Sequence, residues 1–130
     1  MNFGSRLEGL NKYYQTTIII DNFTFNAVKD VFFCRKLDIV TVKGKSDVCD
    51  IYEVINTMDD MKNNPELSEI YHKYEYALAL MIAKNQSEAK TLFEEVLLLL
   101  PNDEPTKIML SRFDVINWET WDGTWQFDGK

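Results

Sequence analysis

The spacing of apolar residues changes along the chain and predicts two structurally different halves. Four apolar residues near the start recur at helical spacing: Phe3, Leu7, Leu10 and Tyr14. Residues 2–14 are therefore predicted to form a helix with one apolar stripe. The β-branched run TTIII, residues 16–20, predicts a short strand. Asp21 and Asn22 offer N-cap side chains for a short helix over residues 23–30.

A pair of longer strands is predicted next. Residues 32–42 (FFCRKLDIVTV) and residues 48–55 (VCDIYEVI) are rich in β-branched and aromatic side chains. The glycine-containing stretch between them has turn chemistry, so the two strands are expected to form an antiparallel hairpin. The alternation of apolar and polar positions slips near Ile39 and Val40, which predicts a bulge there.

Helical spacing returns after a polar stretch that contains a proline. The first stripe consists of Leu67, Ile70, Tyr74, Leu78 and Met81. A second helix is predicted over residues 87–100, stopped by Pro101, and a third over residues 104–116. The tail that follows carries Trp118, Trp121 and Trp125.

These patterns define the expected fold class and domains. We expect an α+β region over residues 1–56, a linker over residues 57–65, helices over residues 66–116, and a tryptophan-rich tail over residues 117–130.

Charge separates the same two halves. Residues 1–56 contain seven basic and seven acidic residues, so the whole net charge of −7 falls on residues 57–130. Phosphate backbones require cationic surface, and an acidic second half therefore argues against nucleic-acid binding.

Compartment signals are few. No apolar run approaches the ~20 residues of a membrane span, and no secretory signal is visible. Cys34 and Cys49 form neither a disulfide framework nor a CxxC metal motif, which favours two reduced, buried thiols in a cytoplasmic protein.

Two sets of polar residues are candidates for chemistry. Asn2 and Arg6 lie four residues apart, on one helix face beside the apolar stripe. Such an arginine can bind phosphate oxygens in a forked contact, and such an asparagine can bind a sugar, although a solvated pair is the alternative. Lys43 and Lys45 flank the turn glycine, where they can hold a polyphosphate or simply remain solvated.

Other catalytic arrangements are not supported. His72 is the single histidine and has no cysteine or carboxylate cluster near it in sequence, so a solvated or packed side chain is expected. Ser5 and Ser46 have no evident base partner.

Two separated motifs resemble one known family. The stretches NFGSRLEGLNKYYQTTIIID, from Asn2, and RKLDIVTVKGKSDVCDIYEVI, from Arg35, look like the C-terminal part of a class III adenylate/guanylate cyclase catalytic domain. In that family an N-x-x-x-R helix precedes a strand, and an R-x-L-D, V-K-G-K, Y-E-V hairpin follows. The resemblance covers residues 2–55 and implies a partial ferredoxin-like cyclase domain.

The resemblance also implies residue roles. Asn2 matches the asparagine that orients the ribose. Arg6 matches the arginine that stabilises charge as the 3′-oxygen attacks the α-phosphorus and pyrophosphate leaves. Lys43 matches the lysine that contacts the β- and γ-phosphates, and Lys45 is a weaker candidate.

The family's metal-binding aspartates and purine-reading residues precede the matched region. Mg²⁺ or Mn²⁺ would therefore be a cofactor of a parent enzyme whose metal ligands are not in this chain. The expected parent converts ATP, rather than GTP, to a cyclic nucleotide and works as a homodimer of cyclase domains. The 130 residues alone are expected to be inactive, and to be marginally stable or to self-associate through an uncovered sheet edge.

The helical half resembles a tetratricopeptide repeat. Ala77, Ala89, Phe93 and Pro101 fall at the repeat's expected positions, and Val96 stands where a small residue is usual. A single helix pair needs a cap, which the tryptophan tail can supply; a recognition surface is the alternative role of those rings. The competing function for the whole chain is a non-catalytic interaction module in which these helices and the aromatic tail bind a protein partner.

Overall fold

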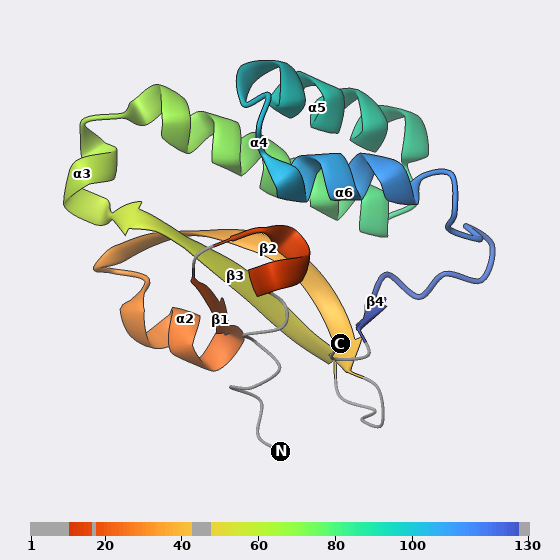
Figure 1. Cartoon of the computed structure of the whole chain (residues 1–130), viewed down its shortest axis with the longest axis horizontal. Helices are drawn as coiled ribbons and strands as arrows, with labels where there is room; N and C mark the ends of the chain where they lie inside the picture. The colour runs from red at the N-terminus through yellow and green to blue at the C-terminus, as the bar shows by residue number, and fades with distance from the viewer. Residues whose placement is uncertain (1–10, 17, 43–47, 128–130) are drawn as a thin grey trace. The chain divides into compact units, whose positions relative to one another are not determined.

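A computed structural model describes residues 11–16, 18–42 and 48–127, and the candidates Asn2, Arg6, Lys43 and Lys45 lie outside them (Figure 1). The chain forms two compact units. The first combines residues up to Asn64 with the last residues from Thr124 onward, and the second is Pro65–Gly123.

The first unit is built on a four-stranded mixed sheet. Its strands are β1 (Ile19–Asp21), β2 (Phe32–Val42), β3 (Val48–Thr57) and β4 (Trp125–Phe127). They are ordered β1-β3-β2-β4. The first three are antiparallel neighbours, whereas β4 lies parallel to the end of β2. The sheet thus includes a strand from the far end of the sequence, which the local pattern did not predict.

The predicted hairpin is confirmed, with β2 at the expected bounds and β3 two residues longer. The register between the strands shifts at Phe33/Cys34 and again between Lys36 and Asp38. The expected irregularity therefore exists, but it precedes Ile39. Because of the second shift, the consecutive residues Leu37 and Asp38 are both buried.

Residues 11–14 are helical and end at Gln15, which adopts a positive φ of 55°. The Thr16 amide donates to the Asn11 carbonyl at 3.0 Å, a bond that closes this helix end. β1 begins three residues later than predicted, at Ile19.

Two short helices flank the hairpin in sequence. Helix α2 (Asn22–Val28) starts at Asp21, whose carboxylate accepts from the Thr24 amide at 2.8 Å, so the predicted N-cap is confirmed. The expected linker over residues 57–65 contains helix α3 (Met58–Lys62). Thr57 caps it by accepting from the Asp60 amide, and Met61 is buried. The polar composition of this stretch concealed the helix.

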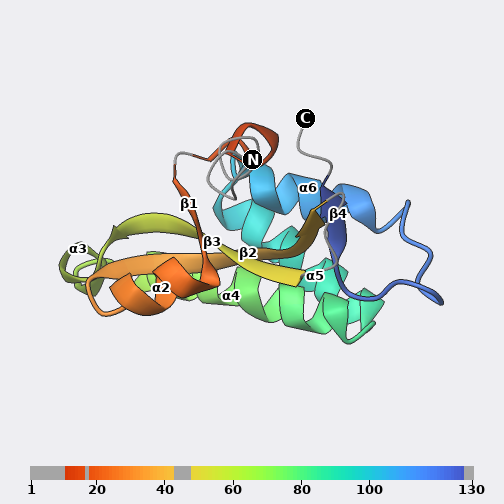
Figure 2. The same cartoon turned by 90° about the horizontal axis from the view of Figure 1, so that it is seen from below.

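The helical residues 11–14 and helix α2 lie on opposite faces of the sheet (Figure 2). The ring of Phe25 on α2 stacks on Tyr52 of β3, with 3.9 Å between centroids. The hydroxyl of Tyr14 bonds to Asp38, whose register partner on β3 is Ile51. Ile51 and Tyr52 are consecutive in β3, so their side chains point to opposite faces of the sheet.

The second unit contains helices α4 (Pro65–Ile82), α5 (Gln86–Leu99) and α6 (Glu104–Arg112). Its core consists of Tyr74, Ala77, Leu78, Met81, Ala89, Phe93, Val96 and Met109. Ala77 and Ala89 are fully buried, as expected where small residues let two helices approach. Helix α6 ends four residues earlier than predicted, because the amides of Val115 and Ile116 both donate to the Arg112 carbonyl in a closing turn.

The three tryptophans of the tail belong to different units: Trp118 and Trp121 lie in the helical unit, and Trp125 lies in the sheet. Trp118 packs against Phe113 and Trp121, and its indole nitrogen donates to the Phe113 carbonyl at 3.3 Å. Phe113 in turn contacts Phe93. Trp118 therefore covers the end of α6 and Trp121 packs on Trp118, an arrangement compatible with a capping role. Trp125 belongs to β4 of the sheet.

Candidate functional site

The hairpin and the helix end that precedes it form the frame to which the predicted site residues are attached in sequence. Arg6 precedes the helical residues 11–14, and Lys43 directly follows the last residue of β2. The described residues show how this frame is held together.

A buried hydrogen bond joins the helix end to β2. The hydroxyl of Tyr14 donates to Oδ2 of Asp38 at 2.5 Å. Tyr14 is wholly buried and Asp38 is 3% exposed. The other oxygen of Asp38 accepts from the Ile39 amide at 2.7 Å. A buried carboxylate needs such donors, so this bond fixes the helix end against the strand that leads to Lys43.

A buried ion pair joins β2 to β3. Arg35 is 1% exposed and donates through both Nε and Nη2 to Oε1 of Glu53, its register partner on the neighbouring strand. Two donors on one carboxylate oxygen hold the guanidinium in a fixed orientation. The motif letters R-x-L-D and Y-E-V thus contribute an arginine and a glutamate that pair with each other in the interior of this unit. The opposite charges of Arg35 and Glu53 were the available signal for this pair, but without the register shift between Lys36 and Asp38 the ladder would place Arg35 opposite Val54.

The opposite face of the hairpin is more open. Lys36 and Asp50 form an ion pair at 3.4 Å, with each side chain about one-third exposed. Both cysteines are half-buried and neither is in a disulfide, which corrects the expectation of buried thiols. Burial raises the pKa of the Cys49 thiol above its ordinary value, and the nearby carboxylates of Asp21 and Asp50 add to the effect. Cys49 is therefore a weak nucleophile at neutral pH.

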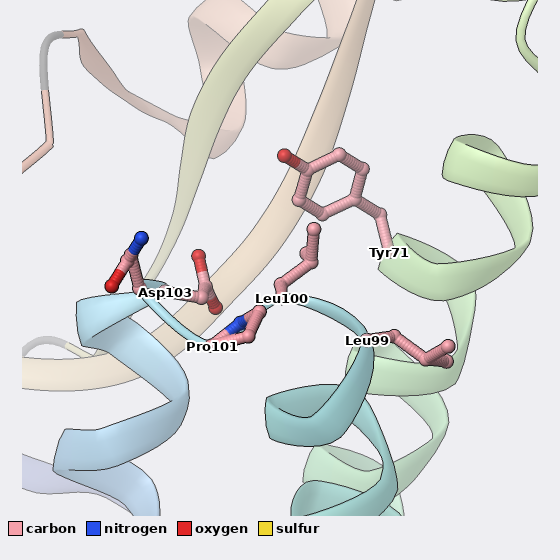
Figure 3. Close-up of a pocket in the computed structure, with 6 residues that line it drawn as sticks. Tyr71, Leu99, Leu100, Pro101 and Asp103 are labelled. Atoms are coloured by element: carbon pink, nitrogen blue, oxygen red, sulfur yellow. The ribbon is translucent and has the colours of Figure 1, made fainter.

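A pocket of about 280 Å³ lies in the helical unit at the connection between α5 and α6 (Figure 3). Tyr71, Leu100 and Asp103 line it, together with Leu99, Pro101 and Asn102. Leu100 points toward the ring of Tyr71, whereas Leu99 points away. Oδ2 of Asp103 accepts from the Thr106 hydroxyl at 2.5 Å. No histidine, cysteine or lysine lines the pocket.

Metal and membrane features are absent from the described part of the chain. Residues 11–16, 18–42 and 48–127 contain no group of three histidine, cysteine or carboxylate side chains that could hold an ion. His72 is exposed on α4. No helix among these residues is long and apolar enough to cross a bilayer.

Comparison with known proteins connects the chain to cyclases. It is 37% identical over 115 residues to the protein named "adenylate cyclase, terminal-differentiation specific" of Dictyostelium discoideum, a match that covers 86% of this chain and 5% of that protein. It is 38% identical over 58 residues to adenylate cyclase 1 of Rhizobium meliloti (strain 1021), covering 45% of this chain and 9% of that protein. The chain is thus related to proteins named adenylate cyclase, and it spans less than a tenth of their length.

The extent of the first match is informative. A match over 86% of the chain is longer than either structural unit, so it includes residues of both the sheet and the helices. No family model matches the chain. No solved structure matches it either.

Proposed function

We propose that these residues form the C-terminal part of a class III nucleotidyl cyclase catalytic domain, followed by a tetratricopeptide-like helical region. The parent enzyme would convert ATP to cyclic AMP and pyrophosphate in intracellular signalling. The observation that carries the proposal is the relationship to a protein named adenylate cyclase over most of this chain, sheet and helices together. ATP is preferred to GTP because both relatives bear that name.

The fold agrees with this proposal at a coarse level. A strand, a short helix and a long antiparallel hairpin follow one another in the order that the cyclase motifs require. Ala77, Ala89 and Phe93 are fully buried, which supports the proposed tetratricopeptide-like pair, in which small residues lie at the helix crossing.

In this scheme Asn2 orients the ribose, and Arg6 stabilises the negative charge that develops on the phosphates as pyrophosphate leaves. Lys43 contacts the β- and γ-phosphates as a mobile point charge. The described residues do not offer a set of metal ligands. We therefore assign no step of the reaction to Mg²⁺ or Mn²⁺ through this chain, and we expect a second cyclase domain to complete the site.

The first experiment measures cyclic AMP formation by the purified 130-residue chain with Mg²⁺ or Mn²⁺ and ATP. No product is expected above a mock purification, because the catalytic constellation is incomplete. Product formed by this chain alone would show that the division of the active site is wrong.

The second experiment places Arg6→Ala in the full-length protein. We expect kcat to fall by about 100-fold or more with a KM for ATP changed less than about threefold, because the arginine acts mainly in the transition state. Lys12→Ala, a change at an exposed position of the helix end, is the matched control and should leave both constants unchanged. An unchanged kcat for Arg6→Ala would remove this residue from the mechanism.

A further inference from the structure

A groove of about 380 Å³ lies between α4 and α5 on the surface of the helical unit. Tyr76 and Leu80 line it from α4, and Glu88, Thr91, Leu92 and Glu95 line it from α5. Its floor is thus apolar and its α5 side carries carboxylates.

Helix α4 presents an exposed aromatic ring, Tyr76, at the edge of this groove. Its buried face contains Tyr74 and Leu78, which belong to the core. Tyr76 follows Tyr74 by two residues, which correspond to about 200° around a helix, so it lies away from the core face. Leu80 is half-buried beside the core residue Met81 and lies on the flank of α4 that lines the groove with α5. Tyr76 is 61% exposed. A large aromatic ring beside an open groove is typical of an anchor point for a partner.

The charges at the groove are negative. Glu88 and Glu95 are seven residues apart and therefore lie on one face of α5, about 10 Å from each other along the helix axis. Lys73 pairs with Glu95 at 3.8 Å, while Glu88 forms no ion pair with any described residue. The surrounding unit, Pro65–Gly123, holds eleven acidic and five basic residues, a net charge of −6.

We infer that this groove binds a basic amphipathic helix of a partner protein. Apolar side chains at positions i and i+4 of the partner would pack on Tyr76, Leu80 and Leu92. A lysine or arginine on its edge would pair with Glu88. Two turns of a partner helix span the separation between Glu88 and Glu95, so basic side chains two turns apart on the partner can reach both carboxylates. This inference does not depend on the proposed cyclase activity.

The test is a selection from a displayed library of random helical peptides, with the 130-residue chain as bait. Peptides that combine leucine or another apolar residue at i and i+4 with lysine or arginine should be enriched, and their affinity should fall as salt is raised. Tyr76→Ala should weaken the best of these peptides by about tenfold. Glu88→Lys should weaken them similarly and should shift a repeated selection toward acidic peptides.

Glu94→Lys is the matched control, because Glu94 is exposed on α5 but does not line the groove. It changes the net charge by the same amount as Glu88→Lys, and it should leave peptide affinity within about twofold. Equal effects of the two reversals would overturn the inference, as would enrichment of acidic peptides or of none by the unmodified chain. Concentration-dependent dimerisation that Tyr76→Ala abolishes would also overturn it, because a second copy would then be the occupant.

Discussion

The hydroxyl of Tyr14 and the carboxylate of Asp38 form a 2.5 Å hydrogen bond between two buried side chains that are 24 residues apart in sequence. It ties the end of the first helix to β2 beside the bulge. The helix end leads back to Arg6 and the strand leads on to Lys43, so this bond supports both segments that the cyclase proposal requires.

Removing the Tyr14 hydroxyl should destabilise the first unit. In Tyr14→Phe the Asp38 carboxylate loses a donor in a site that water does not reach, so the free energy of unfolding should fall by about 1–3 kcal/mol. Urea denaturation measures this change. Tyr13→Phe alters the more exposed neighbour and should cost less than about 0.5 kcal/mol. Equal losses in the two variants would mean that the buried bond contributes no special stability.

Breaking the Arg35–Glu53 pair should cost more than breaking the outer pair of the same hairpin. Glu53→Gln removes the Glu53 charge from the 1% exposed Arg35 guanidinium. A loss of about 3 kcal/mol is expected, at the lower end of the range for buried pairs, because Glu53 is 16% exposed. Asp50→Asn removes the charge that pairs with Lys36 at the open face and should cost at most about 1 kcal/mol. Denaturant titration of both variants decides this, and the reverse ranking would contradict the burial argument.

Lys84→Gly should stabilise the helical unit. Lys84 lies two residues after the end of α4 and adopts a positive φ of 67°. Its amide donates to the Met81 carbonyl, and the next amide, of Asn85, donates to the Leu80 carbonyl. This is the Schellman arrangement, in which glycine is preferred, so a gain of about 0.5–1 kcal/mol is expected. Ala83→Gly, at the preceding residue with negative φ, should instead lose a similar amount. Thermal melts of the two variants should therefore shift in opposite directions.

Alkylation of Cys49 should depend on the charge of Asp21. Burial, then Asp21, raises the Cys49 pKa, so little thiolate exists at pH 8 and iodoacetamide should react slowly. Asp21→Asn keeps an N-cap for α2 but removes the charge; it should lower the pKa and speed the reaction. Asp30→Asn, a change at an exposed aspartate that does not act on this thiol, should have no effect. Mass spectrometry of the Cys49 peptide measures the rates.

The same pKa shift has a defined sign for stability. The folded chain keeps the Cys49 proton at pH values where the unfolded chain has lost it, so this group reduces stability as pH rises above about 8.5. Cys49→Ser should remove that part of the alkaline decline, and an unchanged pH profile of unfolding would show that the thiol does not contribute.

Local patterns predicted the elements whose stabilising contacts are local. The bounds of β2 and the N-cap at Asp21 follow from β-branched runs and cap chemistry, and both are confirmed. Helix α3 was missed because its stripe is short and depends on one buried side chain, Met61. Strand β4 was missed because three residues pair with a strand more than 80 positions earlier, and no local pattern reports such pairing.

For the candidate site, the sequence identified motif residues but not the contacts between their side chains. Arg35 and Glu53 were recognised as parts of motifs, whereas their mutual pairing depends on the hairpin register after a bulge. The placement of Asn2, Arg6 and Lys43 stays a prediction from resemblance, because these residues lie outside the described part of the chain.

The pairing of β4 with β2 makes the helical unit an insertion within a sheet domain, because the chain leaves the sheet after β3 and returns to it after the helices. Deletion of the residues from Thr124 onward would trim the sheet and leave the helices intact. Circular permutation is also suggested by this topology: new ends placed in the turn between α4 and α5 would leave both connections to the sheet in place. In the permuted chain, α4 would be connected to the sheet through β3, and α5 and α6 would be connected to it through β4.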